Sequence, residues 1–107
     1  ILDGMLGQLE QRHGMPLGTV KTTLLLETAG AMRNAYHIAV ANPRVHQLVL
    51  AAGPGGDAAR AVGYQWTKGG EETLFLRSHA VLDARAAGIP YPMTSSWWDI
   101  RDLDGLR

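Results

Sequence analysis

The chain has 107 residues, of which 46% are hydrophobic, and ten basic residues balance ten acidic ones. This length and composition predict one domain's worth of globular sequence. The even charge, without a basic block, argues against nucleic acid or an anionic membrane as a partner. With no cysteine, disulfide frameworks and thiolate sites are excluded, which fits a cytoplasmic location. No apolar stretch approaches the ~20 residues of a membrane span.

The two ends of the sequence indicate how much of a domain is present. Ile1 is not an initiator Met, and the residues after it lack the features of a signal peptide. The sequence stops in what we expect to be the first turn of a helix beginning at Asp102. We therefore expect residues 1–107 to be a single segment of one catalytic domain, incomplete at both ends.

The first predicted elements are a helix and a strand. Apolar residues at helical spacing indicate a helix with one buried face, which Gly14 and Pro16 end. These apolar residues are Leu2, Met5, Leu6 and Leu9. The β-branched and leucine-rich run from Thr19 to Leu26 predicts a strand that is buried on both faces in its second half.

The next predicted pair is a helix over residues 29–41 and a strand over residues 45–50. Met32, Tyr36 and Val40 lie four residues apart, which is helical spacing, and Asn42-Pro43 stops the helix. After the apolar run from Val45 to Leu50, residues 53–57 (GPGGD) cannot form regular structure. A short alanine-rich turn to Gly63 and a loop over residues 64–70 follow.

The last predicted pair is a helix over residues 73–87 and a strand over residues 89–94, before the helix expected at Asp102. Leu74, Val81 and Leu82 lie on one side of the first helix, and Gly88 caps it. Pro90 and Pro92 weaken the strand. Strands alternating with helices predict a parallel sheet with right-handed crossovers. The fold class is therefore α/β, either an open Rossmann-type sheet or about three consecutive units of a (β/α)8 TIM barrel of ~250 residues.

Two acidic residues follow successive strands and form the leading candidate site. Glu27 comes directly after Leu24-Leu25-Leu26, where burial is expected, and Asp57 ends the glycine-rich turn after the next strand. Carboxylates at the carboxyl ends of parallel strands can hold a hard divalent cation such as Mg2+. The alternative for Glu27 is a solvated rim charge or a partner for a nearby arginine.

Asp57 has three alternative interpretations. Gly53, Gly55 and Ala58 match the dinucleotide-binding pattern G-x-G-x-x-A, although no strand ends in an acidic residue ~20 residues later, as ribose binding requires. In the second interpretation the glycines expose backbone N–H groups as an anion-binding nest while Asp57 reaches a metal. In the third, Asp57 is only the N-cap of a short helix.

The remaining reactive side chains show no catalytic arrangement. The four histidines share no metal-ligand spacing, and Ser95-Ser96 has no visible base. Trp66, Trp97 and Trp98 are expected to cover a rim or an interface rather than to bind bases, because no basic groove accompanies them.

Several segments, in this order, resemble the HpcH/HpaI aldolase and citrate lyase beta-subunit family from about Leu17 onward. The resemblance lies in residues 24–31 (LLLETAGA), Ile38-Ala39, the Gly-rich Asp loop, residues 77–89 (RSHAVLDARAAGI) and residues 99–107 (DIRDLDGLR). It implies a (β/α)8 barrel that uses Mg2+ to cleave or form a carbon–carbon bond through a metal-stabilised enolate. The implied substrate is a small molecule, a 2-oxo acid or an acyl-CoA thioester, and a homo-oligomer is expected.

The resemblance also assigns site residues. It implies that Glu27 and Asp57 are the metal ligands, and that the backbone of Gly55, Gly56 and Asp57 binds the keto-acid carboxylate. The catalytic arginine is expected outside these residues. Two positions depart from the family pattern: Gly56 replaces a usual Glu, and Met93-Thr94 stands where relatives often have an Asp. The alternatives are therefore a nucleotide-binding oxidoreductase using the turn from Gly53 to Ala58, and a catalytically silent barrel relative.

Overall fold

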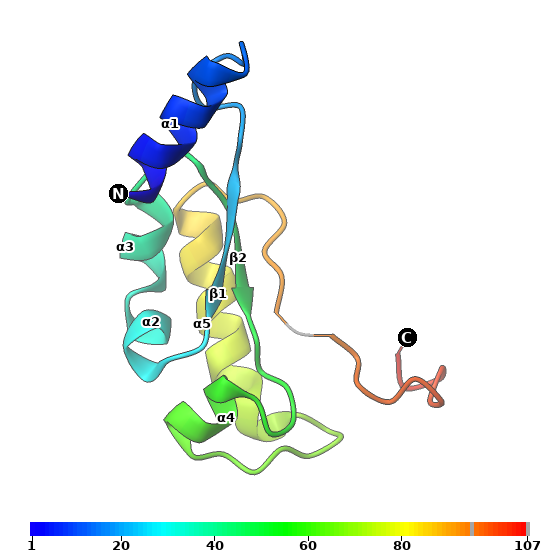
Figure 1. The fold of residues 1–107 in the computed structure, drawn as a ribbon. Coiled ribbons are helices and arrows are strands. Elements are labelled where there is room, and N and C mark those ends of the chain that lie inside the picture. The colour runs from blue at the N-terminus through cyan, green and yellow to red at the C-terminus, as the bar shows by residue number, and fades with distance from the viewer. Residues whose placement is uncertain (95, 107) are drawn as a thin grey trace.

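The computed structural model describes residues 1–94 and 96–106, which alternate between helices and two strands (Figure 1). In chain order the elements are α1 (Leu2–Arg12), β1 (Thr22–Leu26), α2 (Ala29–Arg33), α3 (Ala35–Val40), β2 (Val45–Leu50), α4 (Asp57–Val62), a 3-10 turn (Glu71–Thr73) and α5 (Leu74–Ala86). Within the described ranges, no helix has the length and apolar content to cross a membrane.

The sheet is a parallel pair in which β1 and β2 lie side by side. At its carboxyl end Leu25 pairs with Val49 and Leu26 pairs with Leu50, and the register shifts once, between Thr22 and Thr23. The connection between the strands runs through α2 and α3, as a parallel crossover requires. This arrangement confirms the predicted alternating α/β order and is consistent with a fragment of a TIM barrel.

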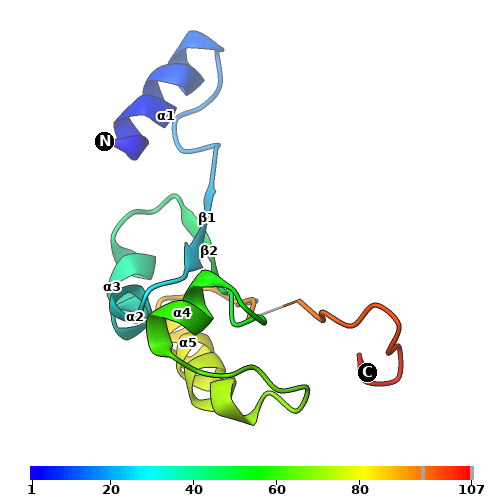
Figure 2. The same cartoon turned by 60° about the horizontal axis from the view of Figure 1, so that its bottom comes forward.

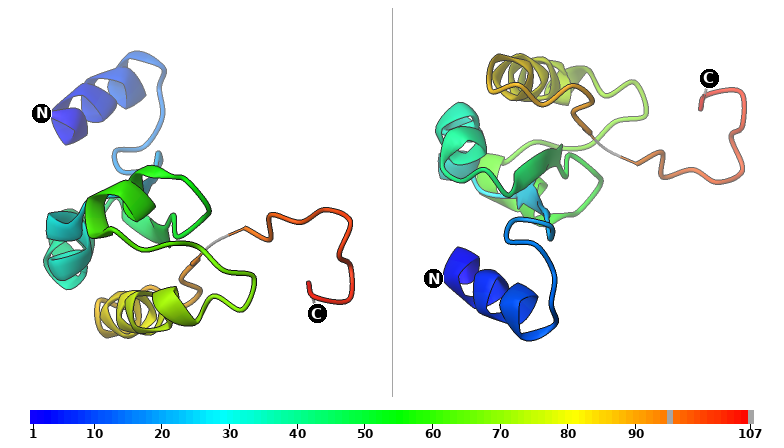
Figure 3. Two further views of the ribbon diagram at one scale, coloured as in Figure 1. Left: turned by 90° about the horizontal axis from the view of Figure 1, so that it is seen from below. Right: turned by 90° about the horizontal axis from the view of Figure 1, so that it is seen from above.

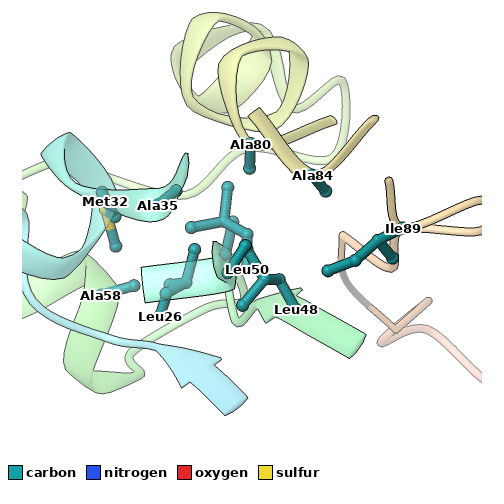
Figure 4. Close-up of a cluster of buried hydrophobic side chains, with 11 residues drawn as sticks. Leu26, Met32, Ala35, Leu48, Leu50, Ala58, Ala80, Ala84 and Ile89 are labelled. Atoms are coloured by element: carbon teal, nitrogen blue, oxygen red, sulfur yellow. The ribbon is translucent and has the colours of Figure 1, made fainter. Parts of the chain in front are cut away.

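The hydrophobic core lies on the face of the sheet that the helices cover (Figure 4). Leu26, Leu48 and Leu50 are each at most 2% exposed. Small residues of the helices, among them Ala35 and Ala84, pack against them and let the helices approach the strands closely. Burial of each leucine stabilises the fold by about 1.5–3 kcal/mol.

The opposite face of the sheet is open in the described part of the chain. Thr23 and Leu25 of β1 are exposed, and Leu25 is 56% exposed, so the expected burial of this strand on both faces is wrong at Leu25. The chain is also extended, with a radius of gyration of 16.0 Å, against about 13 Å for a compact domain of this length.

The helix predicted over residues 29–41 is divided into α2 and α3 at Asn34. The backbone of Asn34 leaves helical geometry (φ −115°, ψ 21°), and its side chain donates to the carbonyl of Gly30 at 2.8 Å. The buried positions are Met32, Ala35 and Ala39. The prediction of helix in this range is therefore confirmed, but as two short helices rather than one.

Helix α1 lies beyond the amino ends of the strands (Figure 2) and on the other side of the sheet from α5 (Figure 3). Its extent agrees with the prediction, but its apolar face is not buried: Leu2, Met5 and Leu9 are 49–57% exposed. The fully buried residue of α1 is Glu10. Charged contacts, rather than apolar packing, hold this helix to the rest of the chain.

Two predictions for the last third of the chain need correction. Residues 89–94 form a single parallel bridge, between Val49 and Met93, instead of a third strand. Pro90 and Pro92 explain this, because proline cannot donate a ladder hydrogen bond. Leu103 to Leu106 form a turn rather than the helix expected from Asp102. This segment extends away from the sheet (Figure 1).

Candidate functional site

The candidate site lies where the two parallel strands end. Leu26 and Leu50 are the last paired residues of β1 and β2, so Glu27 and the loop of residues 51–56 leave the sheet at the same edge. Glu27 is half-buried. Its carboxylate has no hydrogen bond or ion pair with any other residue in ranges 1–94 and 96–106. A half-buried carboxylate is costly unless a cation or donor compensates it, so Glu27 is available to a ligand.

Asp57 is the first residue of α4 and lies on the surface. The N-cap position of α4 is occupied by Gly56, one residue earlier than expected. The interpretation of Asp57 as the N-cap is therefore wrong. The Asp57 carboxylate forms an ion pair with Arg60, and these two side chains are 61% and 69% exposed. An exposed pair of this kind contributes at most about 1 kcal/mol. A cation could therefore replace Arg60 at small cost.

The loop before α4 offers backbone donors. Gly55 has a positive φ of 65°, a conformation that glycine adopts without strain. Its carbonyl accepts a hydrogen bond from Arg60 at 2.7 Å. Among the described residues, the N–H groups of Gly55 and Gly56 donate no backbone or side-chain hydrogen bond. The N–H of Asp57, as the first of a helix, has no intrahelical acceptor. These groups can receive an anion.

The chain can supply two carboxylates for a cation at this edge. No group of three or more His, Asp or Glu side chains in the described residues could hold a metal ion. Mg2+ needs only one or two protein carboxylates, since substrate and water oxygens complete its coordination. Glu27 and Asp57 fit this requirement by chemistry and by their places on the fold. That their carboxylates converge on one ion, with Mg–O distances of ~2.1 Å, stays a prediction.

A hollow of about 280 Å³ adjoins this edge. Its lining combines aromatic rings with two cationic side chains. The lining includes Trp66, Lys68, Arg77, Thr94, Trp97 and Trp98. Arg77 donates to the Gly70 carbonyl at 2.8 Å and to the Thr73 hydroxyl at 3.1 Å, which ties the loop to the start of α5. That the three tryptophans cover a rim or an interface stays a prediction.

The amino end of the sheet carries a different ionic cluster. Arg44 is 6% exposed and binds both carboxylate oxygens of Glu10 at 2.7 Å, while its Nε binds Asp3 at 2.5 Å. Gly18 and Val20 donate backbone N–H groups to the same Glu10 carboxylate. The Arg44 guanidinium and these N–H groups lower the pKa of Glu10 from 4.5 to about 2. Both carboxylate oxygens of Glu10 have hydrogen-bond partners within the chain, so we assign this cluster a role in stability rather than in ligand binding.

Sequence reasoning missed this cluster and Arg60. Glu10 and Arg44 are 34 residues apart, so no local pattern relates them. Arg60 could have been found, because an acidic and a basic residue three apart form a pair on a helix. His79 stacks on Phe75 with ring centres 5.7 Å apart, and its Nδ1 lies 3.5 Å from an Asp83 carboxylate oxygen. Ser95 lies outside the described residues.

Comparison with known protein families identifies a match over almost the whole chain. The family model described as HpcH/HpaI aldolase/citrate lyase matches residues 2–107. No curated protein matches the chain. The matched range spans both strand ends, the glycine-rich loop and the hollow described above.

Proposed function

Because the chain belongs to the HpcH/HpaI aldolase/citrate lyase family, whose members are in general carbon–carbon lyases or aldolases, we propose that its carboxyl edge is a Mg2+-dependent site for such a reaction. The family typically uses a divalent metal and implies a small-molecule substrate. The finer proposal is a 2-oxo acid or acyl-CoA thioester, held between Glu27, Asp57 and the loop N–H groups. A homo-oligomeric assembly remains part of this expectation.

The observation that carries the proposal is the half-buried Glu27 carboxylate at the same edge of the sheet as a loop with unused N–H donors. Glu27 and Asp57 would hold the cation, and the N–H groups of Gly55, Gly56 and Asp57 would bind the substrate carboxylate. A bound divalent cation would neutralise negative charge that develops on a substrate oxygen as the bond breaks. The residues of this chain orient the substrate; the arginine expected for catalysis is not assigned among them.

The dinucleotide alternative has weaker support. Helix α4 has only six residues and begins with Asp57, whose negative charge would lie beside a pyrophosphate. In dinucleotide-binding folds the pyrophosphate lies at the N-terminus of the helix after the glycine turn. In this chain that position carries the Asp57 carboxylate, which would repel the pyrophosphate. The family match also favours lyase chemistry.

Calorimetry with oxalate and NAD separates the two proposals. Oxalate chelates a cation as a 2-oxo acid does, so it should bind the protein with Mg2+ present and fail to bind after chelation. The variant Glu27→Gln keeps the side-chain shape but removes the charge of a proposed direct ligand. It should weaken this binding by at least the ~10- to 100-fold that loss of an outer-shell partner costs. NAD binding that needs no metal, together with no response to oxalate, would overturn the lyase proposal.

A further inference from the structure

Trp98 packs directly on the backbone of Gly53, at the start of the glycine-rich loop. A Cβ atom on Gly53 would lie 2.4 Å from three atoms of the Trp98 indole. Gly53 is not among the glycines with positive φ. Glycine is therefore needed here for close approach of the ring, rather than for an unusual backbone conformation.

Gly53 has a second anchor on the segment that follows α4. The Tyr64 hydroxyl donates to the Gly53 carbonyl at 3.3 Å. Gly53 is buried, whereas Trp98 is 54% exposed. The indole thus covers the loop backbone from the solvent side, and the loop is held at its first glycine.

The segment that carries Trp98 is itself tied down. Trp97 donates its indole N–H to the Asp102 carbonyl at 3.0 Å, and the Gly105 N–H donates to the Asp102 carboxylate at 3.1 Å. The other carboxylate oxygen of Asp102 contacts the Lys68 ammonium, which lowers the pKa of Asp102. Residues 97–105 are therefore linked to the loop before α5.

We propose that Trp98 is a positioning residue that holds the loop of residues 53–57 in place. This inference rests on the proposed function, in which Gly55, Gly56 and Asp57 receive the substrate and the cation. A glycine-rich loop loses much conformational freedom when it is ordered. A ring packed on Gly53 restricts the loop before the ligand binds, so less ordering remains for the binding step.

Magnesium-dependent oxalate binding tests the contact between Gly53 and Trp98. Gly53→Ala should weaken binding about 10- to 100-fold, because the new methyl group displaces the ring and shifts the loop. Gly30→Ala is the matched control, since a Cβ there meets nothing within 4 Å, and its affinity should equal that of the wild type. In a Trp98→Ala background, Gly53→Ala should have no further effect. An equal loss in both backgrounds would contradict the proposal.

Hydrogen exchange in the ligand-free protein gives a second readout that does not depend on the proposed function. Trp98→Ala should speed exchange at the Ala52 and Arg60 N–H groups, which flank the loop and donate to the carbonyls of Leu50 and Gly56, but not in β1 and β2. Trp98→Phe should restore slow exchange. Faster loop exchange without any oxalate binding by the wild type would retain the positioning role and reject the proposed function. Unchanged loop exchange would reject the positioning role itself.

Discussion

The two ends of the parallel sheet differ in whether their carboxylates have partners within the chain. At the amino end, Glu10 is 1% exposed and is bound by Arg44 and two backbone N–H groups. At the carboxyl end, Glu27 is half-buried without a partner in the described residues, and Asp57 is 61% exposed. The first arrangement leaves no coordination capacity for a ligand. The second leaves carboxylate oxygens and N–H groups available.

This difference shows that a strongly shifted pKa does not by itself locate a functional site. The Glu10 carboxyl has a pKa lowered to about 2, yet every partner that lowers it belongs to the chain. Structural ion-pair networks shift pKa values as active sites do. The carboxyl end is the better candidate because Glu27 has no partner in the described residues and the partner of Asp57 is an exposed arginine.

The largest expected effect comes from breaking the amino-end cluster. Arg44→Met would leave the Glu10 charge buried without its cation, so we expect the thermal midpoint to fall by on the order of 10 °C. Glu27→Gln should leave the midpoint nearly unchanged while it weakens Mg2+-dependent oxalate binding. Thermal unfolding of both variants checks this. The contrast between the ends would be lost if Glu27→Gln destabilised the protein as much as Arg44→Met.

A smaller effect on the free energy of unfolding is expected when the pH is lowered. The pKa of Glu10 is lowered from 4.5 to about 2, so the folded state binds fewer protons than the unfolded state in this range. The stabilisation is fully present above the unfolded-state pKa and is lost as pH falls toward the folded-state value. Urea unfolding across this range should show a steeper fall for the wild type than for Glu10→Gln. Parallel curves would show that Glu10 does not set the acid sensitivity.

The smallest effect is expected at the surface pair of the carboxyl end. Arg60→Ala removes an exposed partner of Asp57, so stability should change by less than ~1 kcal/mol. Magnesium should bind a few-fold more tightly, because it no longer displaces the guanidinium. Titration with Mg2+ measures this, with Arg33→Ala, which alters an exposed arginine of α2, as control. Weaker Mg2+ binding by Arg60→Ala would show that Arg60 supports the site.

Local patterns in the sequence predict most of the elements but little of their packing. Strand β2 has the predicted bounds, and Gly63 ends α4 with a left-handed backbone. The division at Asn34 cannot be read from apolar spacing, because it depends on a side-chain hydrogen bond to Gly30. The expected third strand is only a bridge, since its two prolines limit pairing.

The candidate site is predictable as residue types in order along the chain. Glu27 and Asp57 follow successive strands, and a parallel pair does bring both strand ends to one edge. The contact between Trp98 and Gly53 is not predictable, because the residues are far apart in sequence and the turn after Trp97 has no strong local pattern. The ion pair of Glu10 and Arg44 is not predictable either, because 34 residues separate them.

The charged attachment of α1 has a consequence for folding order. Arg44 lies just before β2, and its partners on α1 precede it by more than 30 residues. Contacts between residues so far apart in sequence form later than local ones, because the entropy of loop closure is lost before the contact stabilises the chain. We therefore expect α1 to dock late, after the crossover has brought β2 beside β1, and a ribosome-bound chain that ends before Arg44 should carry α1 undocked.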